Sequence, residues 1–300
     1  MPDHEHKTPL IELIGLTKRF GEVTANQDIH LTVYSGEILS LLGENGSGKT
    51  TLMNMLSGLY RPDSGTIKIN GQEALIHSPL DAIKLGIGMI HQHFRLVEAL
   101  TVSQNIVMGL PGDRKNAKRL ASDIQALSAR FGLTVDPNRT VHSLSVSEKQ
   151  TVEILKVLYR GARILVLDEP TAVLLPQEIK QLFAILRNMK QAGCAVIIIT
   201  HKLHEVLEIS DRVTILRQGR SIDSVETRDT TARELTRMMV GQAVDLSIHR
   251  SSPIKSGPML DVHHLTVLGD NQLKALDDVS FSLEGGEILG VAGVAGSGQR

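Results

Sequence analysis

The fold of this chain is decided by the stretch Gly43-Glu44-Asn45-Gly46-Ser47-Gly48-Lys49-Thr50. It fits the pattern G-x-x-x-x-G-K-[ST] and lies between an apolar run at Ile38–Leu42 and a helical pattern at Thr51–Leu59. That context is expected of a P-loop, in which glycines let backbone N–H groups and a helix N-terminus point at phosphate oxygens. A glycine-rich turn that merely joins a strand to a helix is the alternative, but it requires neither the lysine nor the hydroxyl.

The lysine and the hydroxyl of this loop predict nucleotide chemistry. Lys49 should reach the β- and γ-phosphates, and Thr50 should ligate Mg²⁺. The loop residues predicted to contact the nucleotide are Gly43, Glu44, Asn45, Gly46, Ser47, Gly48, Lys49, Thr50 and Thr51.

A second apolar run, Ile164–Leu167, ends in the carboxylates Asp168 and Glu169. Such a run by itself usually means a strand that ends in solvent, but together with a P-loop it predicts a Walker B strand. Asp168 would then hold Mg²⁺. Glu169 would orient and deprotonate the attacking water, which is the base role in phosphoryl transfer to water.

The pattern of the whole chain predicts an α/β fold. Short runs rich in Val, Ile and Leu alternate with helical patterns such as Ala117–Phe131, which favours a mostly parallel sheet with helices on its faces. Gln92 and His201 each follow an apolar run, so they should lie at the carboxyl edge of the sheet, where such folds bind ligands. Both positions suit sensors of the γ-phosphate, and a capping or core role is the alternative for His201.

Composition excludes several other classes. The chain has 300 residues, and its 32 Lys and Arg against 33 Asp and Glu leave no basic surplus for binding nucleic acid directly. The single cysteine, Cys194, cannot form an internal disulfide, and the start of the chain, Met1–Lys7, lacks the pattern of a signal peptide. No apolar run approaches membrane-spanning length, and we expect the protein in the cytoplasm.

The end of the chain repeats its beginning. Ser35-Gly36-Glu37-Ile38-Leu39 corresponds to Gly285-Gly286-Glu287-Ile288-Leu289, and Gly46-Ser47-Gly48 recurs 250 positions later as Gly296-Ser297-Gly298. That offset suits a duplicated domain better than a solenoid repeat. The domains expected are a first nucleotide-binding domain at 1–242, a linker at 243–257 and the truncated start of a second nucleotide-binding domain at 258–300.

Together these motifs resemble the ATP-binding subunits of ABC transporters, and the resemblance covers nearly the whole chain. The motifs occur in the family's order: Walker A, Gln92 as the Q-loop, a helical insert, a signature segment at Leu144–Glu148, Walker B and the switch His201. The resemblance implies a P-loop NTPase with a RecA-like, mostly parallel core sheet, an antiparallel β subdomain, a helical insert at about 94–143 and a signature helix from 144. It implies an ATPase that powers the import of a small solute through separate membrane subunits.

The resemblance also assigns roles to individual residues. Phe20 corresponds to the family's aromatic residue that stacks on adenine, with a core phenylalanine as the alternative. The implied cofactors are ATP and Mg²⁺. The predicted catalytic residues are Glu169, His201, Lys49 and Gln92, and the predicted magnesium ligands are Thr50, Gln92 and Asp168.

Within the family, the chain resembles the tandem-domain ATPases of sugar and nucleoside uptake. The segment Ile90-His91-Gln92-His93-Phe94 is similar to the branch that imports nucleosides with a lipoprotein receptor. The implied partners are transmembrane permease subunits, a solute-binding lipoprotein receptor and a second nucleotide-binding domain, in cis or in a homodimer. The protein would then lie on the inner face of the cell membrane, with Phe94, Leu96 and Val97 near the contact with the membrane subunits.

Three motifs depart from the family pattern, and one of them is the D-loop, where Leu175 stands in place of the family's Asp. The signature reads Leu144-Ser145-Val146-Ser147-Glu148 where the family has Leu-Ser-Gly-Gly-Gln, so added bulk and a carboxylate should weaken its contact with a phosphate. The second P-loop, Gly293–Arg300, has Gln299 in place of the lysine and Arg300 in place of the hydroxyl. Each nucleotide of an ABC dimer lies between the Walker A of one domain and the signature of the other. The altered signature and the altered second P-loop therefore fall in one composite site, and the other site should be competent.

Two alternatives stay open. A non-transport ABC ATPase that acts on ribosomes or DNA would need a basic linker or long coiled-coil arms, whereas the predicted linker has only His249, Arg250 and Lys255 as basic or potentially basic residues. A P-loop kinase would transfer phosphate to a small molecule, but the signature segment and His201 argue against this class.

Overall fold

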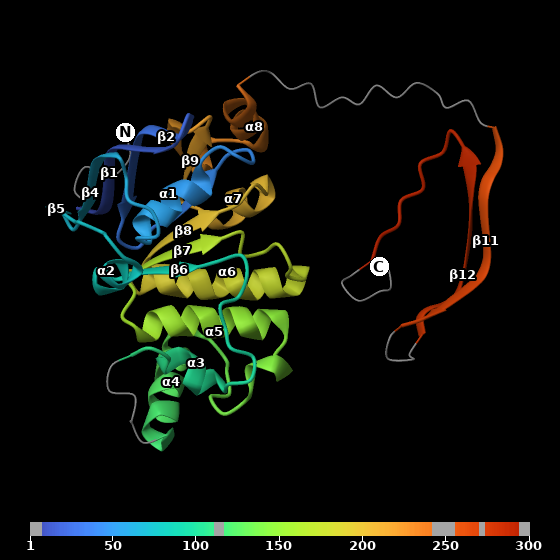
Figure 1. Cartoon of the computed structure of the whole chain (residues 1–300), viewed down its shortest axis with the longest axis horizontal. Helices are drawn as coiled ribbons and strands as arrows, with labels where there is room; N and C mark the ends of the chain where they lie inside the picture. The colour runs from blue at the N-terminus through green and yellow to red at the C-terminus, as the bar shows by residue number, and fades with distance from the viewer. Residues whose placement is uncertain (1–7, 111–116, 242–255, 270–273, 294–300) are drawn as a thin grey trace. The chain divides into compact units, whose positions relative to one another are not determined.

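The computed structural model describes residues 8–110, 117–241, 256–269 and 274–293. The chain divides into two compact units, Met1–Val244 and Asp245–Arg300 (Figure 1). Across the described ranges, every helix is too short or too polar to span a bilayer.

The first unit is built on a central sheet with the strand order β10-β9-β3-β8-β7-β6. β9, β3, β8, β7 and β6 run parallel to one another, and β10 pairs antiparallel with β9. β3 and β8 are buried at every residue, which explains why their sequences lack polar alternation. The strand bounds are Ile38–Leu42 for β3, Ile87–Ile90 for β6, Ile164–Asp168 for β7, Ala195–Ile199 for β8, Arg212–Arg217 for β9 and Arg220–Glu226 for β10.

A smaller antiparallel sheet has the order β2-β1-β4-β5. Its inward side chains, among them Ile11 and Leu31, pack in one cluster with Leu52 and Met53 of α1 and with Leu39 of β3. The sheet therefore covers the segment that carries the P-loop. The strand bounds are Pro9–Phe20 for β1, Val23–Tyr34 for β2, Ser64–Ile69 for β4 and Gln72–Glu73 for β5.

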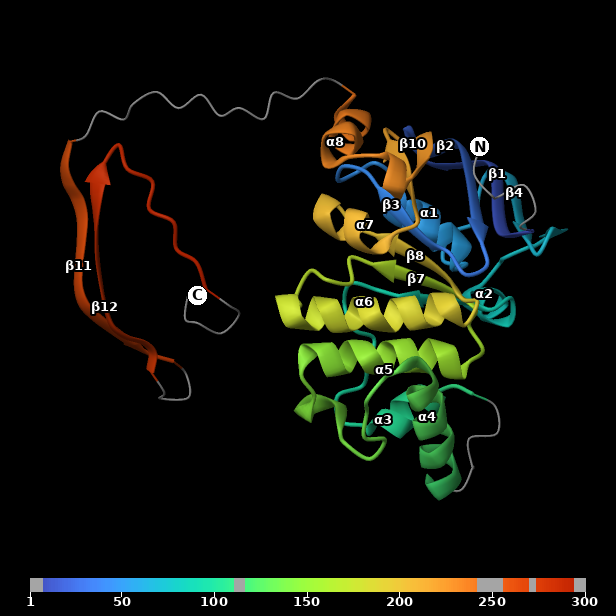
Figure 2. The same ribbon diagram turned by 180° about the vertical axis from the view of Figure 1, so that it is seen from behind.

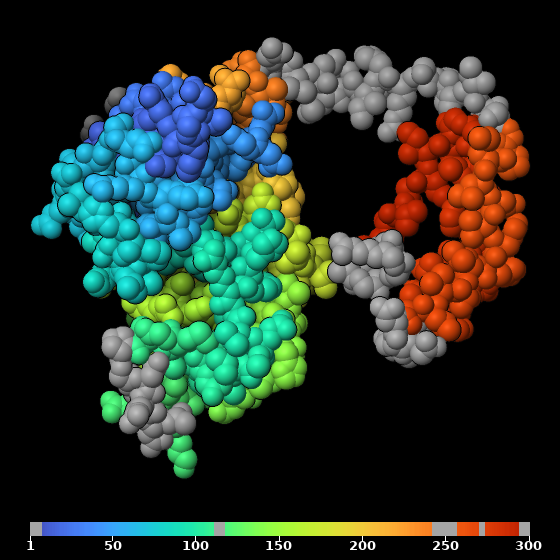
Figure 3. Space-filling model, in the orientation of Figure 1, coloured from blue at the N-terminus to red at the C-terminus, as the bar shows by residue number. Residues whose placement is uncertain are grey.

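The helices on the other side of the central sheet form a separate layer. In Figures 1 and 2, α6 lies between the sheet and α5, and α3 and α4 lie beyond α5. Figure 3 shows the early strands in blue at one end of this unit and the helical insert in green at the other. These elements confirm the predicted parallel core, antiparallel subdomain and helical insert. The helix bounds are Lys49–Leu56 for α1, Pro79–Lys84 for α2, Val102–Val107 for α3, Ala117–Phe131 for α4, Val146–Tyr159 for α5, Pro176–Gln191 for α6, Leu203–Ile209 for α7 and Ala232–Val240 for α8, with short 3₁₀ turns at Val141–Ser143 and Thr227–Asp229.

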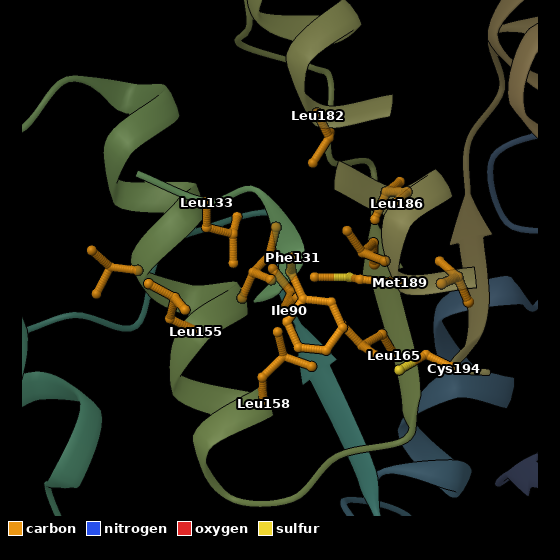
Figure 4. Packing of buried hydrophobic residues seen from close by; sticks show 14 of the residues in the cluster. Ile90, Phe131, Leu133, Leu155, Leu158, Leu165, Leu182, Leu186, Met189 and Cys194 are labelled. Atoms are coloured by element: carbon orange, nitrogen blue, oxygen red, sulfur yellow. The ribbon is translucent and has the colours of Figure 1, made fainter. Parts of the chain in front are cut away.

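One core cluster joins the helical insert to the sheet (Figure 4). Phe131 of α4, Leu158 of α5 and Met189 of α6 pack there with Leu165 of β7 and with Cys194. The Cys194 thiol is buried, and this burial raises its pKa above the ordinary value. The cysteine therefore serves as a small hydrophobic residue that ties α6 to the start of β8.

In the part of the second unit that the structure describes, two antiparallel strands pair as a hairpin, β11 (Ser256–Leu268) and β12 (Lys274–Gly285). β11 takes in the last two residues of the predicted linker, 243–257, whose other residues lie outside the described ranges. The predicted second P-loop also lies outside them, except for Gly293.

The hairpin of the second unit repeats a detail of the hairpin β1–β2. The Asp28 N–H donates to Thr17 Oγ1 at 3.1 Å, and the Asp278 N–H donates to Thr266 Oγ1 at 3.2 Å. Asp28 and Asp278 also share a left-handed backbone, with φ of 53° and 55°. The sequence repeat therefore extends to an irregular backbone feature.

Candidate nucleotide-binding site

A cavity of about 510 Å³ opens where β3, β7 and β8 end. This is the carboxyl edge of the parallel strands, where open α/β sheets bind ligands. The structure thus brings together most of the residues predicted from three separate motifs. The predicted residues that line the cavity are Asn45, Gly46, Ser47, Gly48, Lys49, Thr50, Thr51, Gln92, Asp168 and Glu169.

At Gly48 the P-loop passes so close to β2 that a side chain is excluded. Gly48 has a φ of +96°, and a Cβ atom added to it would lie 2.4 Å from the Ala25 carbonyl oxygen and 2.5 Å from Asn26 Nδ2. Gly48 is also the N-cap of α1 and has no side-chain hydrogen bond. Because Gly48 is the N-cap, α1 begins at Lys49, two residues before the start of the predicted helix at Thr51–Leu59. The helix ends at Leu56, three residues before the predicted end.

The Lys49 side chain is buried within the loop that it follows. Its ammonium donates to the carbonyl oxygens of Gly43 at 2.7 Å and Glu44 at 2.8 Å, so these two predicted residues contact the lysine rather than line the cavity. Burial lowers the pKa of Lys49, while the carboxylates of Glu169 and Asp168 act in the opposite direction. The lysine is therefore a poorly hydrated cation whose hydrogen bonds go to neutral carbonyl oxygens, and such a cation suits a phosphate ligand.

Asp168 and Glu169 follow the buried part of β7. Burial raises the pKa of the Asp168 carboxyl, the neighbouring Glu169 raises it further, and Lys49 partly offsets both effects. Glu169 has a φ of 46°, and its N–H donates to the Ile199 carbonyl oxygen at 2.9 Å. A left-handed backbone at a glutamate is strained, and such strain is concentrated at functional sites.

His201 lies beside Glu169. His201 Nδ1 and Glu169 Oε1 are 2.9 Å apart, and the histidine ring is about half exposed. Gln92 lines the same cavity and is exposed. Phe20 does not line the cavity: it is 44% exposed and packs edge-on against Tyr60, with ring centroids 5.2 Å apart. Its stacking on adenine stays a prediction.

Asn26 was not predicted from the sequence. This buried residue of β2 donates from Nδ2 to the Gly48 carbonyl oxygen at 3.2 Å. Thr24 and Ala25, on the same strand, line the cavity. An asparagine at an inward-facing strand position is the available signal, because a buried amide requires hydrogen-bond partners.

In the signature segment, the side chains of Ser145 and Glu148 cap the N-terminus of α5. α5 begins at Val146 rather than at 144, because Ser145 is its N-cap and its hydroxyl accepts the Glu148 N–H at 3.3 Å. The Glu148 carboxylate accepts the Ser145 N–H at 2.8 Å and also pairs with Arg139 at 2.5 Å. The hydrogen bond from Ser145 is the main reason that the pKa of Glu148 is lowered, with Arg139 contributing. Val146 is exposed beside them.

Comparisons with known proteins agree with this geometry. The ABC transporter family matches residues 26–172. Over 293 residues, the chain is 44% identical to the nucleoside import ATP-binding protein NupA of Lactococcus lactis subsp. cremoris and 45% identical to the guanosine import ATP-binding protein NupO of Bacillus subtilis. It is 41% identical over 293 residues to the ribose import ATP-binding protein RbsA 1 of Streptomyces avermitilis. Each alignment covers 97% of this chain, but the chain spans only 58%, 58% and 55% of the length of these relatives, respectively.

Solved structures of single cassettes match the first part of the chain. The ADP conformation of an ATP-binding cassette of an ABC transporter aligns with a TM-score of 0.69 at 23% identity, covering 78% of this chain and 99% of that chain. The cbiO1 protein of Clostridium perfringens, part of an ABC transporter complex, aligns with a TM-score of 0.67 at 26% identity, covering 78% of this chain and 95% of that chain. The first part of the chain therefore has the fold of a single ABC ATPase cassette, and residues 26–172 match the ABC transporter family.

Proposed function

We propose that this chain binds and hydrolyses ATP to power the import of a small solute, a nucleoside or a simple sugar. The observation that carries this proposal is the single cavity lined by Lys49, Thr50, Gln92, Asp168 and Glu169. The solute class is supported by relatives whose names specify nucleoside, guanosine and ribose import.

In this proposal, different groups of the chain bind the phosphates, accept the proton from water and position the base. Backbone N–H groups at the start of α1 and the Lys49 ammonium hold the β- and γ-phosphates. Glu169 accepts a proton from water as the water oxygen bonds to the γ-phosphorus and the bond to the ADP oxygen breaks. His201, which is 2.9 Å from Glu169, keeps that carboxylate at the cavity.

The residues at the cavity also fit Mg²⁺. Thr50, Gln92 and Asp168 supply a hydroxyl, an amide and a carboxylate oxygen at one cavity, and this hard cation prefers oxygen ligands. When bound, Mg²⁺ would neutralise charge on the phosphate oxygens. Asp168 is the main ligand in this proposal, because it is the carboxylate among these three groups and lines the cavity, and burial and the neighbouring Glu169 raise its pKa, an effect that a bound cation would offset.

Substitution of the base tests the proposed hydrolysis. Glu169→Gln should leave the Kd for Mg-ATP within about twofold and slow single-turnover hydrolysis by at least about 100-fold, the usual contribution of a positioned base. Glu208→Gln is the matched control, because the side chain of this glutamate is exposed on α7 and pairs with Arg187 at 3.9 Å. If Glu169→Gln hydrolysed ATP as fast as the control, the base assignment would be wrong.

Permease subunits are the partners that fit the helical insert. Phe94 and Leu96 line a cavity of about 330 Å³ together with Gln92, and Val97 is exposed nearby in sequence. A partner seated there would respond to the nucleotide through Gln92. The permeases would hold the chain at the inner face of the cell membrane, and a lipoprotein receptor would deliver the solute. Val97→Glu should reduce co-purification with the permeases and leave ATP binding unchanged; unchanged co-purification would contradict this contact.

The second unit belongs to a duplicate of the cassette in this proposal. The proposed division is a first nucleotide-binding domain at 1–242, a linker at 243–257 and the start of a second domain at 258–300. The support is the repeated hairpin, in which the hydrogen bonds Asp28–Thr17 and Asp278–Thr266 occupy corresponding places.

The altered signature would serve the weaker of two composite sites. The closed N-terminus of α5 supports this, because the Glu148 carboxylate already accepts the Ser145 N–H and the Ser145 hydroxyl accepts the Glu148 N–H, so neither donor is open to a phosphate. The competent site would then combine Lys49 and Glu169 with the signature of a second domain. Restoring glycine at Val146 and Ser147 in a protein that carries both cassettes should change ATP turnover little, and a large rise would refute the assignment. This chain alone should bind Mg-ATP and turn it over slowly; turnover equal to that of an intact importer would refute the need for a second signature.

A further inference from the structure

A buried carboxylate lies near Glu169, the proposed base, and is not part of the cavity. Glu205, on α7, is 2% exposed, and its Oε2 accepts a hydrogen bond from Thr171 Oγ1 at 2.6 Å. Thr171 is also 2% exposed and comes two residues after Glu169. A buried carboxylate is retained only where partners compensate for its lost hydration.

Lys202, at the start of α7, is the third member of this cluster. Its ammonium lies 3.1 Å from Glu205 Oε1 and donates to the Thr171 carbonyl oxygen at 3.0 Å and to Thr171 Oγ1 at 3.2 Å. Lys202 directly follows His201, just as Thr171 closely follows Glu169. The turn after β7 and the segment after β8 are therefore joined by hydrogen bonds and an ion pair among two buried residues and the partly buried Lys202, which we name the Thr171–Lys202–Glu205 cluster.

The backbone conformation of Glu169 indicates what this cluster does. Glu169 has a φ of 46°, its N–H bonds to Ile199 O at 2.9 Å, and its carbonyl oxygen accepts the Ala172 N–H at 3.2 Å. A left-handed glutamate persists only where its surroundings hold it in place. The hydrogen bonds of Thr171 fix the turn on one side, and those of Lys202 fix the segment that carries His201 on the other.

We infer that Glu205 is a positioning residue for hydrolysis: through Thr171 and Lys202 it holds Glu169 and His201 at their 2.9 Å contact. Glu205 does not touch the nucleotide cavity, so it acts on the geometry of the base and leaves phosphate binding to the P-loop. The inference rests on the proposed hydrolysis by Glu169. Its structural part, the arrangement of the His201 ring at Glu169, can be measured without any turnover.

The test compares threonine variants that differ in one hydroxyl group. Thr171→Val removes the hydroxyl that bonds Glu205, and Thr171→Ser restores it with less bulk. The ring signals of His201, assigned by their loss in His201→Ala, are recorded by NMR on the chain with labelled histidines. Thr171→Val and Glu205→Gln should shift or broaden these signals, whereas Thr171→Ser and the surface control Glu208→Gln should leave them near the wild-type positions.

Single-turnover kinetics give the second readout. Thr171→Val should slow hydrolysis of bound ATP about tenfold to 100-fold, the range expected for a misplaced catalytic group, with the Kd for Mg-ATP within about twofold. Thr171→Ser should recover most of the rate. If Thr171→Val left both the His201 signals and the rate unchanged, the inference would be wrong. If the wild-type chain did not hydrolyse ATP at all, the proposed function would fail, while the His201 signals would still decide whether the cluster positions the pair. Should Glu205→Gln unfold, the comparison of the two Thr171 variants decides alone.

Discussion

The N-termini of α1 and α5 are two helix starts that differ in what occupies them. α1 follows Gly48, has no side-chain cap and no acidic residue in its first turn, and this turn lines the nucleotide cavity. α5 follows Ser145, and Glu148 closes its first turn by accepting the Ser145 N–H. Free N–H groups at a helix start attract anions. The comparison shows one end open to a phosphate and another that already holds its own carboxylate.

The carboxyl groups near the two helix starts also differ, because their pKa values are shifted in opposite directions. The pKa of Asp168, which faces α1 across the cavity, is raised by burial and by Glu169. The pKa of Glu148 is lowered, chiefly because the Ser145 N–H donates to its carboxylate. The open end therefore keeps an unsatisfied acid ready for a cation, whereas the closed end has satisfied its acid internally.

The largest effect should follow from closing the open end of α1. Gly48→Ala forces a left-handed alanine and a Cβ atom 2.4 Å from the Ala25 carbonyl oxygen. The free energy of unfolding should fall by about 2–5 kcal/mol, from backbone strain and overpacking together. ATP affinity should fall at least about tenfold, because the loop must move. Gly46→Ala is the control, since its φ is +79° but its Cβ atom would meet nothing within 4 Å. Equal losses in both variants would show that close approach is not what keeps Gly48 a glycine.

The next effect concerns the cation at the open end. Lys49→Met should raise the Kd for ATP about tenfold to 100-fold, because a hydrogen bond to a charged group contributes about 1.5–3 kcal/mol. Lys149→Met provides the matched control at α5, where the ammonium of Lys149 pairs with Glu98 at 2.7 Å. Isothermal titration with Mg-ATP measures both. A comparable loss in the Lys149 variant would remove the distinction between the two helix ends.

Local spacing in the sequence was enough to predict the parts of the site that lie close together along the chain. Lys49 follows Gly48 directly, and Asp168 ends an apolar strand, so the P-loop and Walker B could be predicted from neighbouring residues. The buried strands were predicted for the same reason, because β3 and β8 are short runs of mostly apolar residues.

Contacts between distant segments were not predictable in this way. Glu205 meets Thr171 across 34 positions, and Asn26 meets Gly48 across 22, and both contacts arise from packing of separate elements. Glu148 is a different kind of case, because its partners Ser145 and Arg139 lie only three and nine positions away along the chain. The sequence placed its carboxylate near a phosphate, whereas the structure shows it hydrogen-bonded to Ser145 and paired with Arg139.

A smaller effect, of opposite sign for stability and function, should follow from Asp168→Asn. The pKa of Asp168 in the folded chain lies above the ordinary value of 3.8. Between pH 3.8 and this higher pKa, the Asp168 carboxyl binds a proton more often in the folded chain than in the unfolded chain. The carboxyl therefore reduces the stability of the fold as the pH rises. Asp168→Asn should therefore raise the Tm by a few degrees at pH 7, with a gain that shrinks as the pH is lowered toward 3.8. It should also weaken the Mg²⁺ dependence of ATP binding. A lower Tm at pH 7 would contradict the assignment of an uncompensated acid.

The smallest effect should come from Glu148, at the closed end. Its pKa in the folded chain lies below the ordinary value of 4.5, so its charge adds stability that is present above pH 4.5 and is lost as the pH falls through the folded value. Glu148→Gln keeps a hydrogen-bond acceptor for Ser145 and removes the ion pair with Arg139, which is partly exposed. The free energy of unfolding at pH 7 should therefore fall by less than about 1 kcal/mol. Denaturant titrations at pH 7 and pH 4 should show the difference from wild type shrinking at the lower pH. Because the helix start stays closed by Ser145 and the glutamine, ATP affinity should not change; tighter binding would mean that the carboxylate alone had kept a phosphate away from α5.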